Sequence, residues 1–215
     1  MANENSGNCG HRARALVDRE LVEYLLALAV PRRDTKPLAK KPIVQFGGIG
    51  PRLSADAEML RRERLNQGVI GALKIAEATA LRLLETRMGG RPLLSSWEPL
   101  GDYFQAAMDH AATEKVRIPL LNAKKMLIAN ESLWTGSVDE ASVHVREVIA
   151  RAIALGATAL IIVHNHPSGD PAPSRQDIVP TKELIDAGRH MKIAVHDHVI
   201  VGSQGRSSVR AMGLI

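Results

Sequence analysis

The amino-acid sequence predicts an α/β protein in which a mixed sheet wrapped by helices follows a small helical domain. Two observations indicate this architecture. Apolar residues recur at helical spacing through much of residues 15–91, whereas short apolar runs typical of strands occur after residue 95, with helical stretches between them. Gly89, Gly90 and Pro92 break the chain between these parts, so we place the domain boundary there.

The N-terminal part begins with a polar leader, residues 1–14, followed by an amphipathic helix. Asp18 is placed to cap this helix, and Pro31 stops it. Its apolar positions recur at helical spacing: Leu21, Leu25, Leu28 and Ala29. The many prolines and glycines that follow predict turns and at most short helices. Two longer helices are then expected, over residues 55–65 and 71–87.

The second part opens with a helix and a hairpin. Ser96 is placed to cap a helical stretch that runs to about residue 112. Two strand-like runs, residues 115–121 and 126–130, follow it. The polar segment 122–125 between them predicts a hairpin turn.

A helix and a buried strand come next. The helix is expected over residues 145–154, with Gly156 at its C-terminal end. Residues 157–163 are apolar almost throughout, which is typical of a strand covered on both faces. A final strand is expected over residues 193–201, and a short one near residues 207–209.

Two histidines directly follow the buried strand. His164 and His166 are two residues apart in extended backbone, so their side chains should share one face and can hold one cation. Asp177 can supply a third ligand, because the turn-rich loop before Ser174 folds back and Ser174 caps the helix that presents Asp177. Three protein ligands leave a fourth position for water, which is typical of a catalytic zinc site.

Zinc at such a site lowers the pKa of a bound water towards about 7 and polarises a substrate carbonyl. Hydrolysis also needs a carboxylate as general base and a donor to the oxyanion, for which the Ser174 hydroxyl lies close in sequence. We therefore expect one Zn²⁺ per chain, although manganese, iron or nickel also suit two imidazoles and a carboxylate.

The composition is that of a globular protein, with 45% hydrophobic and 24% charged residues. The sequence has no run of eighteen or more apolar residues and no signal-peptide pattern, so we expect a soluble, cytoplasmic protein with no membrane partner. Its single cysteine, Cys9, can form neither an internal disulfide nor a cysteine-rich zinc cluster.

Charge differs between the two parts of the chain. Residues 1–91 contain 16 Lys/Arg and 10 Asp/Glu, whereas residues 92–215 contain 12 and 13. A basic domain beside a neutral one suits a polyanionic partner such as DNA, although an ordinary solvated surface explains the same charge.

The spacing His-x-His, seven residues, Ser, two residues, Asp matches the JAMM signature of MPN+ metalloprotease-like proteins. The flanking His-Asn-His-Pro-Ser-Gly-Asp-Pro-x-Pro-Ser, with His-Asp-His-Val-Ile-Val-Gly further on, resembles the RadC-like branch of that superfamily. Over about residues 95–215, this resemblance implies a JAB/MPN fold of the cytidine-deaminase-like type. It also implies zinc held by His164, His166 and Asp177, with Ser174 as oxyanion stabiliser.

Residues 15–91 resemble more loosely the helical N-terminal region of RadC-like proteins, where a helix-hairpin-helix-like element is expected. The glycine-rich hairpin of that region is present only in the degraded form Gln-Gly-Val-Ile-Gly-Ala, at residues 67–72. A working hairpin would offer backbone N–H groups at a helix N-terminus to a phosphate.

The catalytic glutamate has two candidates. Glu114 immediately precedes the first predicted strand, as in the family pattern. Glu147 lies in a segment that resembles the RadC-like His-Pro-Arg-Glu-Val but lacks its proline. We favour Glu114.

Several other polar residues flank the expected ligands. His196 and His198 form a second His-x-His on a predicted strand. Three roles are compatible with this position: orienting the ligands, stabilising the structure or, for one of the two histidines, serving as an extra ligand. Asn165, Ser168 and Asp170 are expected to shape the loop through turn hydrogen bonds.

The first functional hypothesis is a zinc-dependent hydrolase of the JAMM type, a metallopeptidase or isopeptidase that acts on a protein or peptide with metal-activated water. The alternative is a DNA-associated repair or recombination accessory protein that binds DNA through residues 15–91. A nuclease that uses the same metal is a third hypothesis. The balanced charge of residues 92–215 argues against a nucleic acid substrate held by that part alone.

Overall fold

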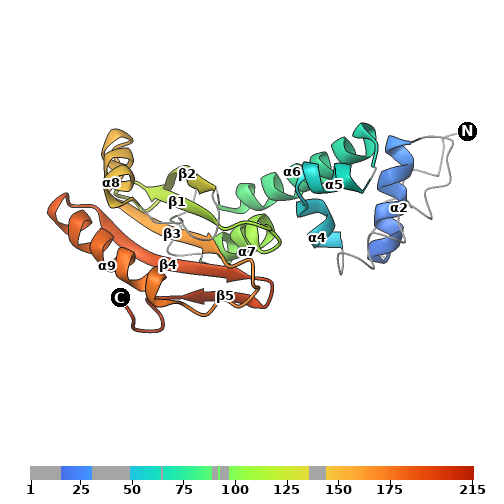
Figure 1. Ribbon diagram of the computed structural model, residues 1–215. Helices are drawn as coiled ribbons and strands as arrows, with labels where there is room; N and C mark the ends of the chain where they lie inside the picture. Colours follow the sequence, from blue (N-terminus) through green and yellow to red (C-terminus); the bar gives the residue numbers. More distant parts are fainter. Residues whose placement is uncertain (1–15, 31–48, 64, 89–91, 93–96, 136–143) are drawn as a thin grey trace, which may run out of the picture. The chain divides into compact units, whose positions relative to one another are not determined.

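The computed structural model describes residues 16–30, 49–63, 65–88, 92, 97–135 and 144–215 (Figure 1). The chain divides into two compact units, Met1–Thr79 and Ala80–Ile215. The division falls within helix α6 (Gln67–Met88), whose last residues therefore belong to the second unit. The predicted leader, residues 1–14, and most of the predicted boundary, residues 89–91, lie outside the described residues. Both stay predictions.

The first helix, α2 (Asp18–Ala29), begins differently from the prediction. The residue before it is Val17, whose backbone N–H donates to the Glu20 carboxylate at 3.1 Å. Asp18 lies in the first turn, and its carboxylate accepts the backbone N–H of Ile49 at 3.2 Å. The prediction that Asp18 caps this helix was wrong, because its carboxylate bonds to a distant segment of the chain instead.

Two short helices, α4 (Ile49–Ser54) and α5 (Ala57–Arg62), occupy the region where we predicted turns and then one helix over residues 55–65. A new helix begins at α5 because the Asp56 carboxylate accepts the backbone N–H of Glu58 at 2.7 Å. The apolar core of this unit consists of buried side chains from α2, α5 and α6, together with Ala55 between α4 and α5: Val22, Leu26, Ala55, Leu60, Val69, Ile70 and Leu73. Ile49 and Leu53 of α4 are partly buried against it.

Helix α6 starts earlier than predicted, at Gln67 rather than near Gly71. The Asn66 side chain accepts the backbone N–H of Val69 at 2.9 Å, as an N-terminal cap does. The segment 67–72, where the sequence retains traces of a hairpin, is therefore the start of a helix. In the described part of the chain, none of the helices combines the length and apolar character needed to cross a membrane.

The second unit is built on a five-stranded sheet with the order β2-β1-β3-β4-β5 (Figure 1). Its strands are β1 (Lys115–Leu121), β2 (Leu127–Thr135), β3 (Ala159–Asn165), β4 (Ala194–Gly202) and β5 (Gly205–Ser208). Among these strands, β3 and β4 run parallel, and the other neighbouring pairs are antiparallel. The predicted α/β class, with a mixed sheet, flanking helices and a helical N-terminal region, is confirmed.

Helices cover both faces of the sheet. They are α7 (Trp97–Met108), α8 (Val145–Ala154) and α9 (Arg175–His190). Ile161 and Val163 of β3 pack in the core formed with α7, whereas Leu160 and Ile162 pack in the core formed with α8 and α9. Every residue of β3 is buried, which explains why its sequence is apolar without alternation.

Strand β3 runs further than predicted, through Asn165, so that His164 lies within the sheet. Helix α8 has the predicted bounds, and Gly156 beyond it has a φ of 66°, the left-handed conformation that glycine adopts after a helix. The sheet therefore delivers the His-x-His segment at the C-terminal end of its central strand.

Candidate metal centre

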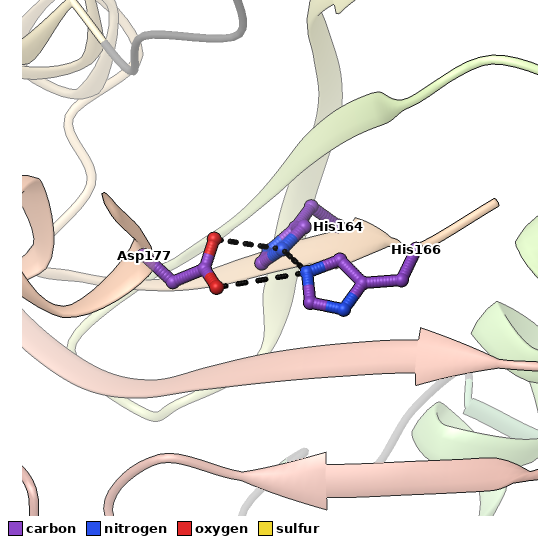
Figure 2. A group of neighbouring side chains, drawn as sticks. All are labelled: His164, His166 and Asp177. Carbon is purple, nitrogen blue, oxygen red and sulfur yellow. Dashed lines mark hydrogen bonds and ion pairs between the residues drawn. The ribbon is translucent and has the colours of Figure 1, made fainter. Parts of the chain in front are cut away.

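Three side chains that can hold a cation converge at the end of β3 (Figure 2). His164 lies at the end of β3, His166 directly follows that strand, and Asp177 comes from the first turn of α9. The Nε2 atoms of the two histidines are 2.9 Å apart. Asp177 Oδ1 is 3.1 Å from Nε2 of His164, and Oδ2 is 3.6 Å from Nε2 of His166. The fold thus brings together the three residues that the sequence singled out.

Local geometry positions each of these side chains. The backbone stays extended beyond β3, because the N–H of His166 donates to the carbonyl of Val201 at 2.8 Å. At the start of α9, Ser174 Oγ accepts the N–H of Asp177 at 3.3 Å, and Asp177 Oδ2 accepts the N–H of Ser174 at 2.7 Å. This reciprocal cap holds the Asp177 carboxylate at the helix terminus.

The other ring nitrogen of each imidazole, Nδ1, is hydrogen-bonded to a residue outside the group His164, His166 and Asp177. Nδ1 of His166 lies 2.8 Å from the carbonyl oxygen of Asp170, to which it donates. Nδ1 of His164 lies 2.7 Å from Nε2 of His198. The two Nε2 atoms are therefore the ones that face Asp177.

His198, one of the second His-x-His pair, contacts the candidate ligands. Its side chain is only 3% exposed, and its Nδ1 lies 2.6 Å from the hydroxyl oxygen of Thr181. The Thr181 hydroxyl donates to the backbone carbonyl of Asp177 at 2.5 Å. Thr181 was not predicted from the sequence, because no sequence pattern distinguishes it from other threonines within helices. Its role depends on the contact between α9 and β4.

His196 has different surroundings. Burial lowers the pKa of its imidazole, and the charges of Lys125 and Arg210 act in the same direction. Of the two histidines that the sequence left open, only His198 has a described contact with a candidate ligand.

The cluster has strongly shifted pKa values. Burial acts to raise the pKa of Asp177, but hydrogen bonds with His164 and His166 outweigh it and hold that pKa far below the usual range. The hydrogen bond with Asp177 raises the pKa of His166, against the lowering effect of burial. Burial lowers the pKa of His198 to about 3, so this imidazole is neutral at neutral pH.

Both the donor types and their spacing fit a tetrahedral divalent ion. Ligand atoms about 2.0–2.1 Å from a tetrahedral ion lie about 3.3 Å from one another. The three separations here are 2.9, 3.1 and 3.6 Å. Two imidazoles and a carboxylate form a ligand set of catalytic zinc sites, in which the fourth position is left to water or substrate.

The two candidate bases lie in different places. Glu114 directly precedes β1, in which Val116 pairs with His164, and continuing this register places Glu114 opposite His166. The charge of Glu114 also contributes to the raised pKa of His166. Glu147 is exposed in the first turn of α8. Glu114 is therefore the carboxylate that the described contacts associate with the cluster.

Asn165, between the two histidines, holds the backbone on either side of Glu114. Its Oδ1 accepts the N–H of Lys115 at 2.9 Å, and its Nδ2 donates to the carbonyl of Thr113 at 3.2 Å. We expected Asn165 to shape the following loop. That expectation was wrong, because β3 continues through Asn165 and directs its side chain to the segment before β1.

This fold and this cluster define a class of protein, the mixed α/β domains with a JAMM-type arrangement of His-x-His and Ser-x-x-Asp. Residues 94–214 match the family model described as the RadC-like JAB domain. The chain is also 44% identical over 204 residues to a UPF0758 protein of Rhodobacter capsulatus, covering 94% of this chain and 95% of that protein. The chain belongs to the RadC-like JAB family.

Proposed function

We propose that this protein is a zinc-dependent hydrolase of the JAMM type, in which His164, His166 and Asp177 hold one Zn²⁺ ion. The proposal depends above all on the convergence of two Nε2 atoms and a carboxylate within 4.8 Å, with both Nδ1 atoms engaged elsewhere. Acceptor atoms that face one another need a cation or a proton between them. Membership of the RadC-like JAB family supports the same class of reaction.

The roles of the protein groups follow from their positions. When bound, zinc activates a water molecule and polarises the substrate carbonyl. Glu114 accepts the proton of the attacking water and transfers it to the leaving amine. The Ser174 hydroxyl donates to the oxygen that becomes negative, because the cap at Asp177 uses a lone pair of Oγ and leaves its hydrogen free for this bond.

We propose a peptide or isopeptide bond in a protein as the substrate. The JAMM-type resemblance supports this choice. The charge balance supports it as well, because residues 92–215 contain 12 Lys/Arg and 13 Asp/Glu and have no excess of cations to neutralise a phosphate backbone.

Metal analysis of the purified full-length protein tests the site. We expect one zinc per chain in the wild type and none in His164→Ala or His166→Ala, because each change leaves only two protein ligands. His196→Ala is the matched control and should retain zinc, since this histidine of β4 has no described hydrogen bond or ion pair with the three ligands. Undiminished zinc in the double variant His164→Ala/His166→Ala would overturn the proposal.

Two glutamine variants test the general base. Glu114→Gln should retain zinc and lose about 10²-fold or more in turnover on any peptide or isopeptide substrate that the wild type cleaves. Glu147→Gln is the control and should keep its activity. The reverse pattern would assign the base to Glu147 and leave the ligand set unchanged.

A second candidate function is DNA association through residues 15–91, as in a repair or recombination accessory protein. The excess of Lys/Arg in residues 1–91, 16 against 10 Asp/Glu, favours it. Arg61 and Arg62 lie exposed in the last turn of α5. Their double replacement by glutamate should weaken a salt-sensitive affinity for duplex DNA, whereas Arg189→Glu on α9 should not. Equal weakening by both would contradict this assignment.

A further inference from the structure

We infer that Thr181 and His198 are positioning residues that hold the His164 imidazole in the one tautomer able to bind a metal ion. The inference rests on the proposed function, since it takes His164, His166 and Asp177 to bind a cation. Thr181 and His198 act through His164 and need no contact with the ion or the substrate.

The hydrogen bonds that join these residues have one consistent direction. The backbone carbonyl of Asp177 can only accept, so the hydroxyl hydrogen of Thr181 points to it across 2.5 Å. The Thr181 oxygen then accepts from Nδ1 of His198 across 2.6 Å. A neutral imidazole has one N–H, so Nε2 of His198 accepts from Nδ1 of His164 across 2.7 Å. The neutral His164 imidazole then carries its hydrogen on Nδ1, so that Nε2, the atom that faces Asp177, has a lone pair for a metal ion.

This series of hydrogen bonds connects three elements of the fold. Asp177 and Thr181 lie one turn apart on α9, His198 lies on β4, and His164 lies on the neighbouring parallel strand β3. Thr181 and His164 are each 2% exposed and His198 is 3% exposed, so bulk water cannot substitute for a missing partner. Asp177 takes part twice, because its carboxylate faces the histidines while its carbonyl sets the direction of the hydrogen bonds.

Removing the threonine hydroxyl removes the group that sets this direction. Valine has the shape of threonine but neither donates nor accepts, so the Nδ1–H of His198 would lose its buried acceptor. His198 then gains by carrying its hydrogen on Nε2, directed at Nδ1 of His164. That change moves the hydrogen of His164 to Nε2, where it occupies the position that a metal ion needs.

The affinity of the full-length, metal-free protein for Zn²⁺ tests this inference, measured by competition with a chromophoric chelator. Thr181→Val should bind Zn²⁺ about 10- to 100-fold more weakly, the range found when groups that orient a metal-binding histidine are removed. Thr181→Ser keeps the hydroxyl and should bind as the wild type does. Thr79→Val is the matched control, because the Thr79 hydroxyl donates to the carbonyl of Ile75 in the same way on an exposed face of α6. Its affinity should be unchanged.

Histidine ring ¹⁵N chemical shifts of the metal-free protein provide a readout that a merely structural role would not change. The wild type and Thr181→Ser should show a hydrogen on Nδ1 of His164, and Thr181→Val should show none there. Circular dichroism and thermal unfolding identify a variant that fails to fold, in which case Thr181→Ala replaces it in both measurements.

The outcomes separate this inference from the proposed function. If the wild type binds Zn²⁺ and folded Thr181→Val binds it equally well, or keeps the wild-type tautomer of His164, the inference is overturned and the metal site stands. If the wild type does not bind Zn²⁺, the proposed metal site is overturned and the inference with it.

Discussion

Replacement of Asn165 by alanine should destabilise the second unit by about 2–3 kcal/mol, through backbone groups that lose their partners. Asn165 is fully buried and bonds to the N–H of Lys115 at 2.9 Å and to the carbonyl of Thr113 at 3.2 Å. A buried backbone group left without a partner costs about 1–3 kcal/mol. The Lys115 N–H should contribute most of the loss. The Thr113 carbonyl should contribute less, because Thr113 is exposed and water can reach it.

Urea unfolding followed by tryptophan fluorescence measures this loss, because both tryptophans of the chain, Trp97 and Trp134, lie in Ala80–Ile215. Asn122→Ala is the matched control. The Asn122 side chain also accepts two backbone N–H groups, at 2.9 and 3.0 Å, but at a partly exposed hairpin turn where water can replace it. Its loss should stay below about 1 kcal/mol.

The reasoning is refuted if Asn165→Ala loses no more stability than Asn122→Ala. Hydrogen exchange of the Lys115 amide is an independent check and should accelerate in the Asn165 variant. Folded Asn165→Ala should retain zinc, because the three ligands are unchanged. Its turnover should fall, because the backbone on either side of Glu114 is no longer held.

Asp177→Asn should release zinc in metal analysis, since an amide oxygen has no formal charge to offset that of the cation, and full zinc content would exclude Asp177 as a ligand. Gly202→Ala should lower the free energy of unfolding by about 2 kcal/mol or more, because a Cβ there would collide with the backbone carbonyl of Gly169. In Gly71→Ala, where a Cβ meets open space within a helix, thermal unfolding by circular dichroism should show no loss, and equal losses in the two variants would contradict the collision. Zinc affinity should fall as the pH is lowered through the raised pKa of His166, because the proton that Asp177 stabilises on this imidazole must leave before zinc binds. Calorimetry at several pH values should detect that proton release, and an affinity independent of pH in this range would contradict it.

The three candidate ligands could be identified from the sequence because their placement depends on local geometry. Alternation along an extended strand directs His164 and His166 to one face. The reciprocal cap of Ser174 and Asp177 presents the carboxylate at the start of α9. Each of these relations joins residues no more than three positions apart. The hairpin turn and Gly156 after α8 were predictable for the same reason, since backbone conformation over a few residues decides them.

The hydrogen bonds around these ligands depend on the tertiary structure alone. Asn165 bonds to a backbone N–H 50 residues earlier in the chain, and Thr181 bonds to a histidine 17 residues later. The choice of Asp18 as a helix cap failed for a similar reason, because its carboxylate bonds to Ile49, 31 residues away. Such contacts depend on which strands and helices become neighbours and in what register. A slip of one residue between β1 and β3 would move Glu114 to the opposite face of the sheet. The packing of helices on both faces and the hydrogen bonds of Asn165 to Lys115 and Thr113 oppose that slip.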